Sequence, residues 1–267
     1  MMTVLFVKSL LFLLGLCLGS FCNVVIHRSI SENSHPFSFW SRSRCPNCAA
    51  PIGWYDLIPV VSFLLLRGRC RFCAYTIAHR YWVVELFMGF ICLGLYPLLL
   101  WGNTEGFILS LVVAMGLITL FFTDLEKGLL PDQIQIPIFF FLLFGTAWID
   151  PHPLPRLFSG FIAATLGWII IWSINRMYFI WRGQDGFGGG DSKMMAWLGV
   201  FYGWRSLLGI FFLAALLGTL WGILIKIQRQ TPWNMKLPFG SFLAISAGII
   251  SLWGESLWRF YLELVIS

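Results

Sequence analysis

Four cysteines occur as two closely spaced pairs in the first third of the chain. The pairs are Cys45-Pro-Asn-Cys48 and Cys70-Arg-Phe-Cys73, separated by residues 49–69. Two Cys-x-x-Cys pairs at such a separation are typical of a tetrahedral four-thiolate zinc site, because each tight turn presents two sulfurs. Four thiolates leave no open coordination position, so the pattern predicts a structural zinc rather than a catalytic one.

Other states of these cysteines are two disulfides or four free thiols. The loop is predicted below to lie in the cytoplasm, which is reducing, and this argues against disulfides. His27, His35 and His79 are alternative ligands, although each alone is typical of a polar loop residue. Zinc is favoured because the loop 27–80, at about 50 residues, is too small to form a stable core without a bound metal or another cross-link.

Asp124 and Asp191 form the second group whose residue types suggest chemistry. Asp124 ends one apolar run, and Asp191 follows a run of glycines and begins another. Two carboxylates at close quarters do not both ionise easily, so one holds a proton while the other acts as a base, and such a pair activates water against a peptide carbonyl. Gly188 and Gly190 are substrate-site candidates, because glycine lets backbone approach closely. The alternatives are a helix cap for Asp191 and a solvated boundary position for Asp124.

Three more charged residues accompany these groups. Glu85 lies early in an apolar run, where it is either a boundary residue paired with Arg80 or a polar group in a substrate groove. Lys193 contacts a substrate carbonyl, lowers the pKa of a nearby carboxylate, or is one of the positive residues of the cytoplasmic face, and the last is favoured. Asp132 is interpreted as a helix-starting or supporting group rather than as the primary acid.

The chain that must position these residues is very apolar. Of its 267 residues, 58% are hydrophobic and 11% are charged, whereas soluble domains have about 25% charged residues. This composition excludes a soluble enzyme, a secreted disulfide scaffold and a disordered chain, and it predicts an all-α polytopic membrane protein. The apolar runs predict about eight transmembrane helices, near residues 4–26, 82–101, 107–123, 134–149, 157–180, 192–203, 207–227 and 239–253.

The positive charges predict the orientation of these helices. If eight spans alternate, fourteen of the 18 lysines and arginines fall on the side of the loop 27–80. Positive residues are retained in the cytoplasm, so this loop and both aspartates are predicted to face the cytoplasm, with the N terminus outside. The net charge of +6 is thereby explained by topology, without nucleic-acid binding. The first run lacks an Ala-x-Ala cleavage site and is interpreted as an anchor.

The ordered motifs resemble those of type IV prepilin peptidases, which are bacterial inner-membrane aspartic proteases of the Gly-x-Gly-Asp class. The departures, at Cys22, at His27 and at residues 184–187, remove no catalytic group. The resemblance covers nearly the whole chain. The matching segments are Gly19-Ser-Phe-Cys-Asn-Val-Val-Ile-His-Arg28, 43–48, 51–59, 66–73, 80–86, Thr123-Asp124, Leu130-Pro131-Asp132, Gly188-Gly-Gly190-Asp191-Ser-Lys193 and Pro238-Phe-Gly240.

The resemblance implies a membrane aspartic endopeptidase with Asp124 and Asp191 as its catalytic pair. Such an enzyme cleaves the leader of type IV prepilins and pseudopilins after a glycine at the cytoplasmic membrane boundary. Many members then N-methylate the new N-terminal residue with S-adenosylmethionine, an activity associated with the cysteine-containing loop. No binding motif for this cofactor is visible, so its residues are unassigned and the methyltransferase activity rests on the resemblance alone.

The resemblance also implies the organisation and setting of the chain. We expect a first transmembrane helix at 1–26, a cytoplasmic four-cysteine zinc domain at 27–80 and a transmembrane aspartic peptidase domain at 81–267. The expected location is the bacterial inner membrane, with the N terminus in the periplasm. The expected partners are prepilins, pseudopilins and the lipid bilayer, and the oligomeric state is left open. A transporter or channel with a zinc domain, and a pilus or secretion scaffold without catalysis, are the competing hypotheses.

Overall fold

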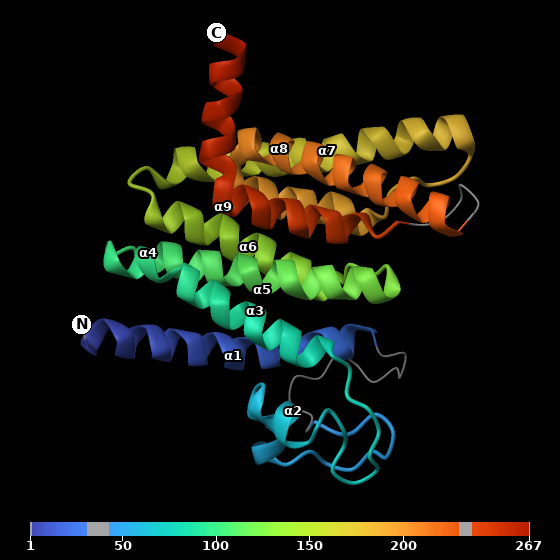
Figure 1. Ribbon diagram of the computed structural model, residues 1–267. Helices are drawn as coiled ribbons and strands as arrows, with labels where there is room; N and C mark the ends of the chain where they lie inside the picture. The colour runs from blue at the N-terminus through green and yellow to red at the C-terminus, as the bar shows by residue number, and fades with distance from the viewer. Residues whose placement is uncertain (1, 31–42, 230–236, 267) are drawn as a thin grey trace. The chain divides into compact units, whose positions relative to one another are not determined.

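The computed structural model of the chain describes residues 2–30, 43–229 and 237–266, and it is built from helices joined by loops (Figure 1). It divides into two compact units, Met1–Thr119 and Leu120–Ser267. Across the described residues, six helices are long and apolar enough to cross a membrane. The all-α, multi-pass membrane class predicted from composition is therefore confirmed.

The first unit contains a pair of packed helices, a segment of short helices and the greater part of α5. Its elements are α1 (Met2–Ile30), the 3₁₀ helix η1 (Trp54–Leu57), α2 (Val61–Leu65), α3 (Arg80–Gly94), α4 (Tyr96–Leu100) and α5 (Thr104–Lys127), whose last two turns belong to the second unit. The second unit adds α6 (Asp132–Ile149), α7 (Pro153–Arg182), α8 (Gly189–Arg229) and α9 (Phe239–Ile266).

Small residues let α1 and α3 pack closely in the first unit. A Cβ added to Gly15 would lie 2.5 Å from the carbonyl oxygen of Met88, and one added to Gly19 would lie 2.6 Å from Glu85 Cα. Gly15 and Gly19 are one helical turn apart, which is the small-xxx-small spacing of close membrane-helix contacts. Residue numbers rise along α1 as they fall along α3, so the two helices are antiparallel.

Close contacts at glycines also pack α7 against α8 in the second unit. A Cβ added to Gly167 would lie 2.6 Å from the carbonyl oxygen of Met195, and one added to Gly199 would lie 2.6 Å from that of Ala163. Substitution by any larger residue would force the backbones apart. These contacts fix the start of α8, which carries Asp191, against α7.

Helix α8 consists of two halves that meet at Gly203. Gly203 has φ 76° and ψ 166°, so the backbone leaves the helical conformation there. The second half begins beside the middle of α9, where an added Cβ on Gly209 would lie 3.6 Å from Ile250. It ends beside the start of α9, where a Cβ added to Gly222 would lie 3.2 Å from Leu237 Cδ1.

The first half of α8 runs in the opposite direction. Arg156, near the start of α7, donates a hydrogen bond of 3.5 Å to the carbonyl oxygen of Val200. The hydroxyl of Tyr202 donates one of 3.3 Å to the carbonyl oxygen of Ala247. The end of the first half and the beginning of the second therefore both lie beside the middle of α9, and the chain turns back at Gly203.

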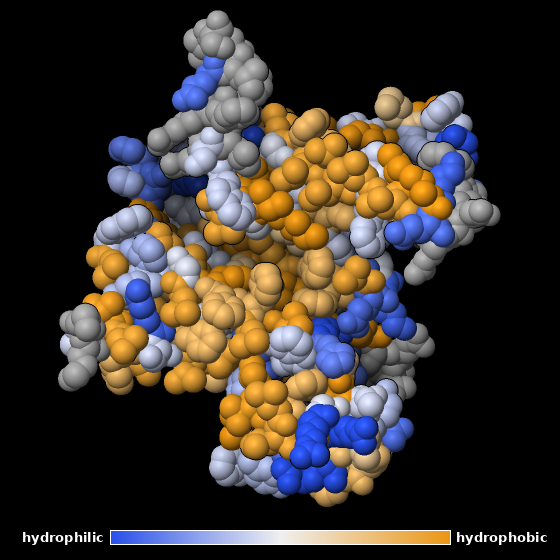
Figure 2. Space-filling view, in the orientation of Figure 1, coloured by the Kyte–Doolittle hydropathy of each residue, from blue (hydrophilic) through white to orange (hydrophobic). Residues whose placement is uncertain are grey.

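The observed helices differ from the predicted runs mainly at their ends. The predicted run 82–101 is divided into α3 and α4 at Leu95, just before Pro97. The predicted runs 192–203 and 207–227 are the two halves of α8, and the run 239–253 extends to Ile266 as α9. Apolar side chains cover much of the outer surface of the helices, and hydrophilic ones gather on the short-helix segment before α3 (Figure 2).

Candidate active site and metal-binding cluster

Asp124 lies in the last turn of α5 and is 6% exposed. Its Oδ2 accepts a hydrogen bond of 2.7 Å from the backbone N–H of Ser241 and lies 3.2 Å from the Ser241 hydroxyl, which also bonds the carbonyl oxygen of Phe121 at 3.0 Å. Ser241 belongs to the first turn of α9, whose N–H groups have no partner within their own helix. The start of α9 therefore acts as an anion-binding site for Asp124.

Asp191 is the third residue of α8 and is also 6% exposed. Its Oδ2 accepts a hydrogen bond of 3.0 Å from the N–H of Gly188, while its own N–H donates to the carbonyl oxygen of Gly188 at 3.1 Å. This is the side-chain half of a capping box, so Asp191 does cap its helix. Its Oδ1 is nevertheless buried and has no hydrogen-bond partner in the described part of the chain. One oxygen of Asp191 thus caps, and the other is left for a further ligand.

Leu130 brings the two aspartates into one site. A Cβ added to Gly190 would lie 2.6 Å from Leu130 Cβ, and one added to Gly240 would lie 2.8 Å from Leu130 Cδ1 and 3.1 Å from Asp124 Oδ2. The starts of α8 and α9 therefore both pack on the turn that follows α5. The carboxyl groups of Asp124 and Asp191 are close enough for their charges to repel each other. This pairing is what water activation by two carboxylates requires.

The other residues predicted near Asp191 have partners within the protein. Lys193 Nζ lies 2.5 and 2.6 Å from the two carboxylate oxygens of Asp132, which links the first turns of α8 and α6. Gly190 is packed against Leu130. Around Gly188, an added Cβ would meet only Asp191 Oδ2, at 3.5 Å, and the nitrogen of Gly190, at 4.0 Å.

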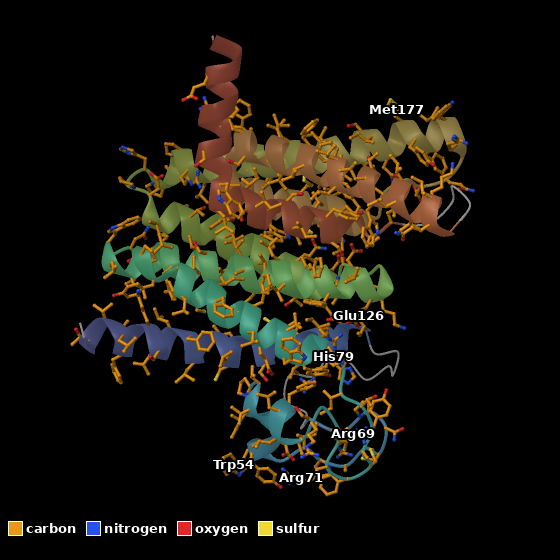
Figure 3. All side chains as sticks on the ribbon, viewed as in Figure 1. Trp54, Arg69, Arg71, His79, Glu126 and Met177 are labelled. Atoms are coloured by element: carbon orange, nitrogen blue, oxygen red, sulfur yellow. The ribbon has the colours of Figure 1, made fainter. Side chains whose placement is uncertain are left out.

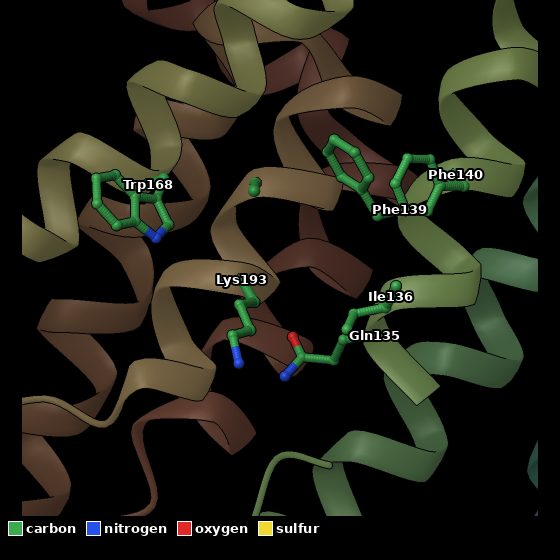
Figure 4. Close-up of a pocket in the computed structure, with 7 residues that line it drawn as sticks. Gln135, Ile136, Phe139, Phe140, Trp168 and Lys193 are labelled. Atoms are coloured by element: carbon green, nitrogen blue, oxygen red, sulfur yellow. The ribbon is translucent and has the colours of Figure 1, made fainter. Parts of the chain in front are cut away.

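A cavity of about 210 Å³ opens beside this ion pair (Figure 4). Lys193 and Gln135 lie on one side of it, and its walls are mostly apolar. Gln135 is 1% exposed, donates its amide N–H to the carbonyl oxygen of Leu130 at 3.1 Å and has no hydrogen-bond partner for Oε1 in the described structure. The lining residues are Gln135, Ile136, Phe139, Phe140, Trp168, Lys193 and Ala196.

The residue of this site that the sequence did not reveal is Ser241. It directly follows the Pro238-Phe-Gly240 motif, which is therefore the available signal. A serine three residues after a proline, at the beginning of an apolar run, is common at helix starts, so its type alone indicates nothing about Asp124. Only the fold brings residues 124 and 241 together.

The four predicted metal ligands converge in the first unit. The sulfur atoms of Cys45, Cys48, Cys70 and Cys73 all lie within 4.8 Å of one another, and those of Cys45 and Cys73 are 3.8 Å apart. Tetrahedral zinc with Zn–S bonds of about 2.3 Å requires sulfurs about 3.8 Å apart. None of the seven cysteines forms a disulfide, so the alternative of two disulfides is wrong. The cluster has the ligand set and spacing of a metal site.

The two cysteine turns have the same backbone. The N–H of Cys45 bonds the carbonyl oxygen of Ala50, and the N–H of Cys70 bonds that of Tyr75 five residues on in the same way. Ala49 and Ala74 both follow the second cysteine of their pair and both have φ 55°. Two copies of one turn therefore present their sulfurs to a common point.

Backbone N–H groups prepare two of the thiols for metal binding. The N–H of Tyr75 lowers the pKa of Cys73 to about 6, and that of Cys48 lowers the pKa of Cys45. The N–H of Ala50 lowers the pKa of Cys48, but burial and the neighbouring thiols outweigh this effect and raise that pKa to about 11. Thiolates are the metal-binding form, so the lowered pKa values of Cys73 and Cys45 favour metal binding.

Charged groups hold the metal-binding segment together. Arg71, between the second pair of cysteines, binds both carboxylate oxygens of Asp56 in η1, at 3.0 and 2.6 Å. Arg71 and Trp54 lie on this segment in Figure 3. Glu85 of α3 is 7% exposed, and its Oε2 accepts a 2.7 Å hydrogen bond from the N–H of Val60 at the start of α2. His79 packs near Phe63 and Trp82, outside the sulfur cluster, and His35 lies outside the described residues.

Comparison with known proteins gives consistent matches along the chain. The model of the bacterial peptidase A24 N-terminal domain matches residues 13–98, and that of the type IV leader peptidase family matches residues 111–223. A prepilin leader peptidase/N-methyltransferase of Aeromonas hydrophila is 34% identical over 95% of this chain and 93% of its own length. No solved structure matches significantly.

Two further relatives carry the same name. That of Burkholderia pseudomallei (strain 1026b) is 30% identical over 94% of this chain and 86% of its own length. That of Pseudomonas aeruginosa is 30% identical over 94% of this chain and 92% of its own. The family inferred from the ordered motifs is confirmed, and the chain belongs to the type IV leader peptidase family.

Proposed function

We propose that the protein is a membrane aspartic endopeptidase that removes the leader of type IV prepilins and pseudopilins and then N-methylates the new N terminus. The observation that carries the peptidase is the buried pair Asp124 and Asp191, with one oxygen of Asp191 unpartnered. Relatives of nearly the same length are named prepilin leader peptidase/N-methyltransferase, which supports both activities.

In the proposed reaction the two carboxyl groups share one negative charge. Asp124 carries it, because Ser241 donates to its Oδ2. Asp191 holds the proton on Oδ1, the oxygen without a partner. Asp124 takes a proton from water as the water oxygen bonds the peptide carbonyl carbon, and Asp191 donates its proton toward the carbonyl oxygen. Collapse of this intermediate breaks the C–N bond: the leaving amine takes the proton now held by Asp124, and a hydroxyl of the intermediate returns a proton to Asp191 as the new carboxyl group forms.

The substrate is proposed to lie along the start of α8. Cleavage after a glycine allows the scissile backbone to approach the carboxyl pair, and Gly188 is the candidate for contact with it because the space around it is open. Gly190 packs on Leu130 and Lys193 pairs with Asp132, so their proposed contribution to the substrate site is to shape it. Glu85 lies in the first unit, where it binds the N–H of Val60, and its proposed role is confined to that unit.

We propose eight membrane crossings, with α8 contributing two of them. The reversal at Gly203 and the apolar helix Phe239–Gly254 support this number. The first half of α8 has 15 residues, about 22 Å, so Asp191 lies near the membrane edge, where water is available. We further propose the three-part division at residues 26 and 80, an inner-membrane location, a cytoplasmic active site and a periplasmic N terminus, on the basis of the positive-residue distribution.

The four cysteines are proposed to hold one structural zinc. Their spacing and thiolate-favouring backbone support zinc over four free thiols. S-adenosylmethionine would supply the methyl group when bound, and no described residue is assigned to it. Metal analysis of reduced, folded protein should find one zinc per chain. Finding no metal in folded protein would contradict this proposal.

The peptidase is tested by incubating purified protein with a prepilin, with and without S-adenosylmethionine, and by mass spectrometry of the product. We expect a shortened product, and a further mass of one methyl group only when the donor is present. Asp124→Asn and Asp191→Asn should each lower the cleavage rate by more than about 100-fold.

Asp150→Asn is the matched control, because Asp150 lies at the other end of α6 from Asp132 and accepts a hydrogen bond only from the local N–H of His152 among the bonds described. It should cleave normally. Normal cleavage by either Asp124→Asn or Asp191→Asn would show that the carboxyl pair is not the active site.

A further inference from the structure

The loop between α7 and α8 is held by one side chain, that of Asn175. Its Oδ1 accepts hydrogen bonds from the backbone N–H groups of Gly186, at 2.7 Å, and Phe187, at 3.0 Å. Its Nδ2 donates to Asp185 Oδ1 at 3.2 Å. Asn175 lies two turns before the end of α7, so a single residue of that helix binds three consecutive residues of the loop.

These bonds fix the orientation of the Asn175 amide. Two N–H donors must face its oxygen, and a carboxylate must face its NH₂ group. An aspartate at this position would keep the acceptor, but it would lose the donor and place a second negative charge against Asp185. Alanine would lose all three bonds. Position 175 therefore requires an amide side chain. The sequence alone does not indicate this requirement, because Asn175 is simply a polar residue in a long apolar helix.

The held loop leads directly to the carboxyl pair. Gly188, the next residue after Phe187, donates its N–H to Asp191 Oδ2 at 3.0 Å. The ring of Phe187 packs edge-on against that of Phe239, with centroids 4.7 Å apart. Phe239 is the first residue of α9, which brings Ser241 to Asp124. The loop thus contacts the groups that bind each aspartate.

We propose that Asn175 is a positioning residue of the peptidase, which holds the loop so that Gly188 binds Asp191 and Phe187 supports the start of α9. This inference rests on the proposed function of Asp124 and Asp191. Among the bonds described, Asn175 binds only loop residues and neither aspartate of the pair. Its loss would displace a carboxyl group whose reaction depends on its placement, so it should act on the chemical step rather than on substrate affinity.

The test compares kcat and KM for prepilin cleavage in four variants. Asn175→Ala and Asn175→Asp should lower kcat about 10-fold or more with little change in KM. Asp185→Asn alone keeps an acceptor for Asn175 and should remain near wild type. Combined with Asn175→Asp it exchanges amide and carboxylate, so the double variant should regain about 10-fold over Asn175→Asp.

Ser173→Ala is the control on the same helix, because the Ser173 hydroxyl bonds only the carbonyl oxygen of Ile170 among the contacts described. Equal zinc content and helical circular dichroism would show that each variant is folded. Wild-type kcat in both single Asn175 variants would overturn the inference, as would a change confined to KM or a double variant no better than Asn175→Asp.

Asp191→Asn, measured in parallel, distinguishes a failure of the proposed peptidase function from a failure of the positioning role of Asn175. If it is inactive while the Asn175 variants are normal, the proposed function stands and the positioning role falls. If Asp191→Asn cleaves normally, the proposed function fails and the positioning role falls with it.

Discussion

At the scale of single residues, each aspartate of the pair is bound at the start of a helix. Asp191 caps its own helix through Oδ2 and leaves Oδ1 buried without a partner. Asp124 is bound by the N–H at the beginning of another helix. Helix starts favour negative charge, which offsets part of the cost of placing carboxylates in an apolar chain.

The Ser241 hydroxyl provides a direct measure of this support. Ser241→Ala removes the 3.2 Å contact to Asp124 Oδ2 but keeps the 2.7 Å bond from the backbone N–H. Because the hydroxyl proton is shared with the carbonyl oxygen of Phe121, we expect a loss in kcat of about 10-fold, at the lower end for a hydrogen bond to a charged group. Single-turnover cleavage of a prepilin measures it.

Ser246→Ala is the matched control for this change. Ser246 lies in the same helix, is fully buried and has an Oγ without a partner in the described structure. Its removal should leave kcat unchanged. Equal losses in the two variants would mean that α9 packing, and not the bond to Asp124, is responsible.

The residues whose chemistry is visible in their type could be predicted from the sequence. Asp124 and Asp191 stood out because acids are costly in apolar runs, and the four cysteines because of their spacing; the structure brings each group together. Ser241 and Asn175 were not found. Both are ordinary polar residues in sequence, and their partners are supplied by a fold that brings distant segments into contact.

At the scale of elements, the glycine run before Asp191 has unequal positions. A Cβ on Gly190 would lie 2.6 Å from Leu130 Cβ, whereas nothing lies within 4 Å of one on Gly189. We expect Gly190→Ala to lower kcat/KM about 10-fold or more, because an overpacked contact costs about 1–3 kcal/mol. Gly189→Ala, one residue away, should cleave prepilin normally.

This pair of variants also tests how α8 meets the turn after α5. Gly189 is the variable position of the Gly-x-Gly-Asp motif, which agrees with the open space around it. A damaging Gly189→Ala together with a tolerated Gly190→Ala would show that the starts of α8 and α9 do not pack on Leu130 as described.

The cysteine turns contain a strained position that the sequence alone does not show. Ala49 and Ala74 adopt φ 55°, a left-handed conformation that costs an L-residue about 1–2 kcal/mol and glycine little. Ala49→Gly and Ala74→Gly should each make the metal harder to remove, with the chelator concentration at half-loss rising up to about 10-fold. Zinc release followed with a coloured chelator measures this.

Ala50→Gly provides the comparison, because Ala50 is not among the residues with positive φ. It should give no gain, since added flexibility favours the metal-free state. If all three glycine variants behave alike, the left-handed turn is not what limits metal retention.

At the scale of the whole chain, composition predicted a multi-pass helical protein, and the helix ends were the less predictable part. Apolar runs report where lipid contact is possible, but helices continue into boundary regions, as α9 does beyond residue 253. The division between the sixth and seventh predicted runs did correspond to a break, at Gly203. A polar loop was not needed there, because a single left-handed glycine ends the helix.

The number of crossings made by α8 is the last property open to a direct test. A straight helix of its 41 residues would be about 62 Å long, twice the hydrocarbon thickness of about 30 Å. If the two halves cross separately, as proposed, residues 184 and 228 should lie on one side of the membrane and residue 205 on the other. Cysteines introduced as Gln184→Cys, Arg205→Cys and Gln228→Cys, in a chain whose Cys17, Cys22 and Cys92 are alanine, report these sides. In spheroplasts, a membrane-impermeant thiol reagent should label only Arg205→Cys. In inverted vesicles it should label Gln184→Cys and Gln228→Cys, but not Arg205→Cys, above the level given by the parent chain that keeps only Cys45, Cys48, Cys70 and Cys73. Labelling of Gln228→Cys but not Gln184→Cys in spheroplasts would show a single crossing and would place the start of α9 on the side opposite Asp191, which the shared contact of Gly190 and Gly240 with Leu130 does not allow.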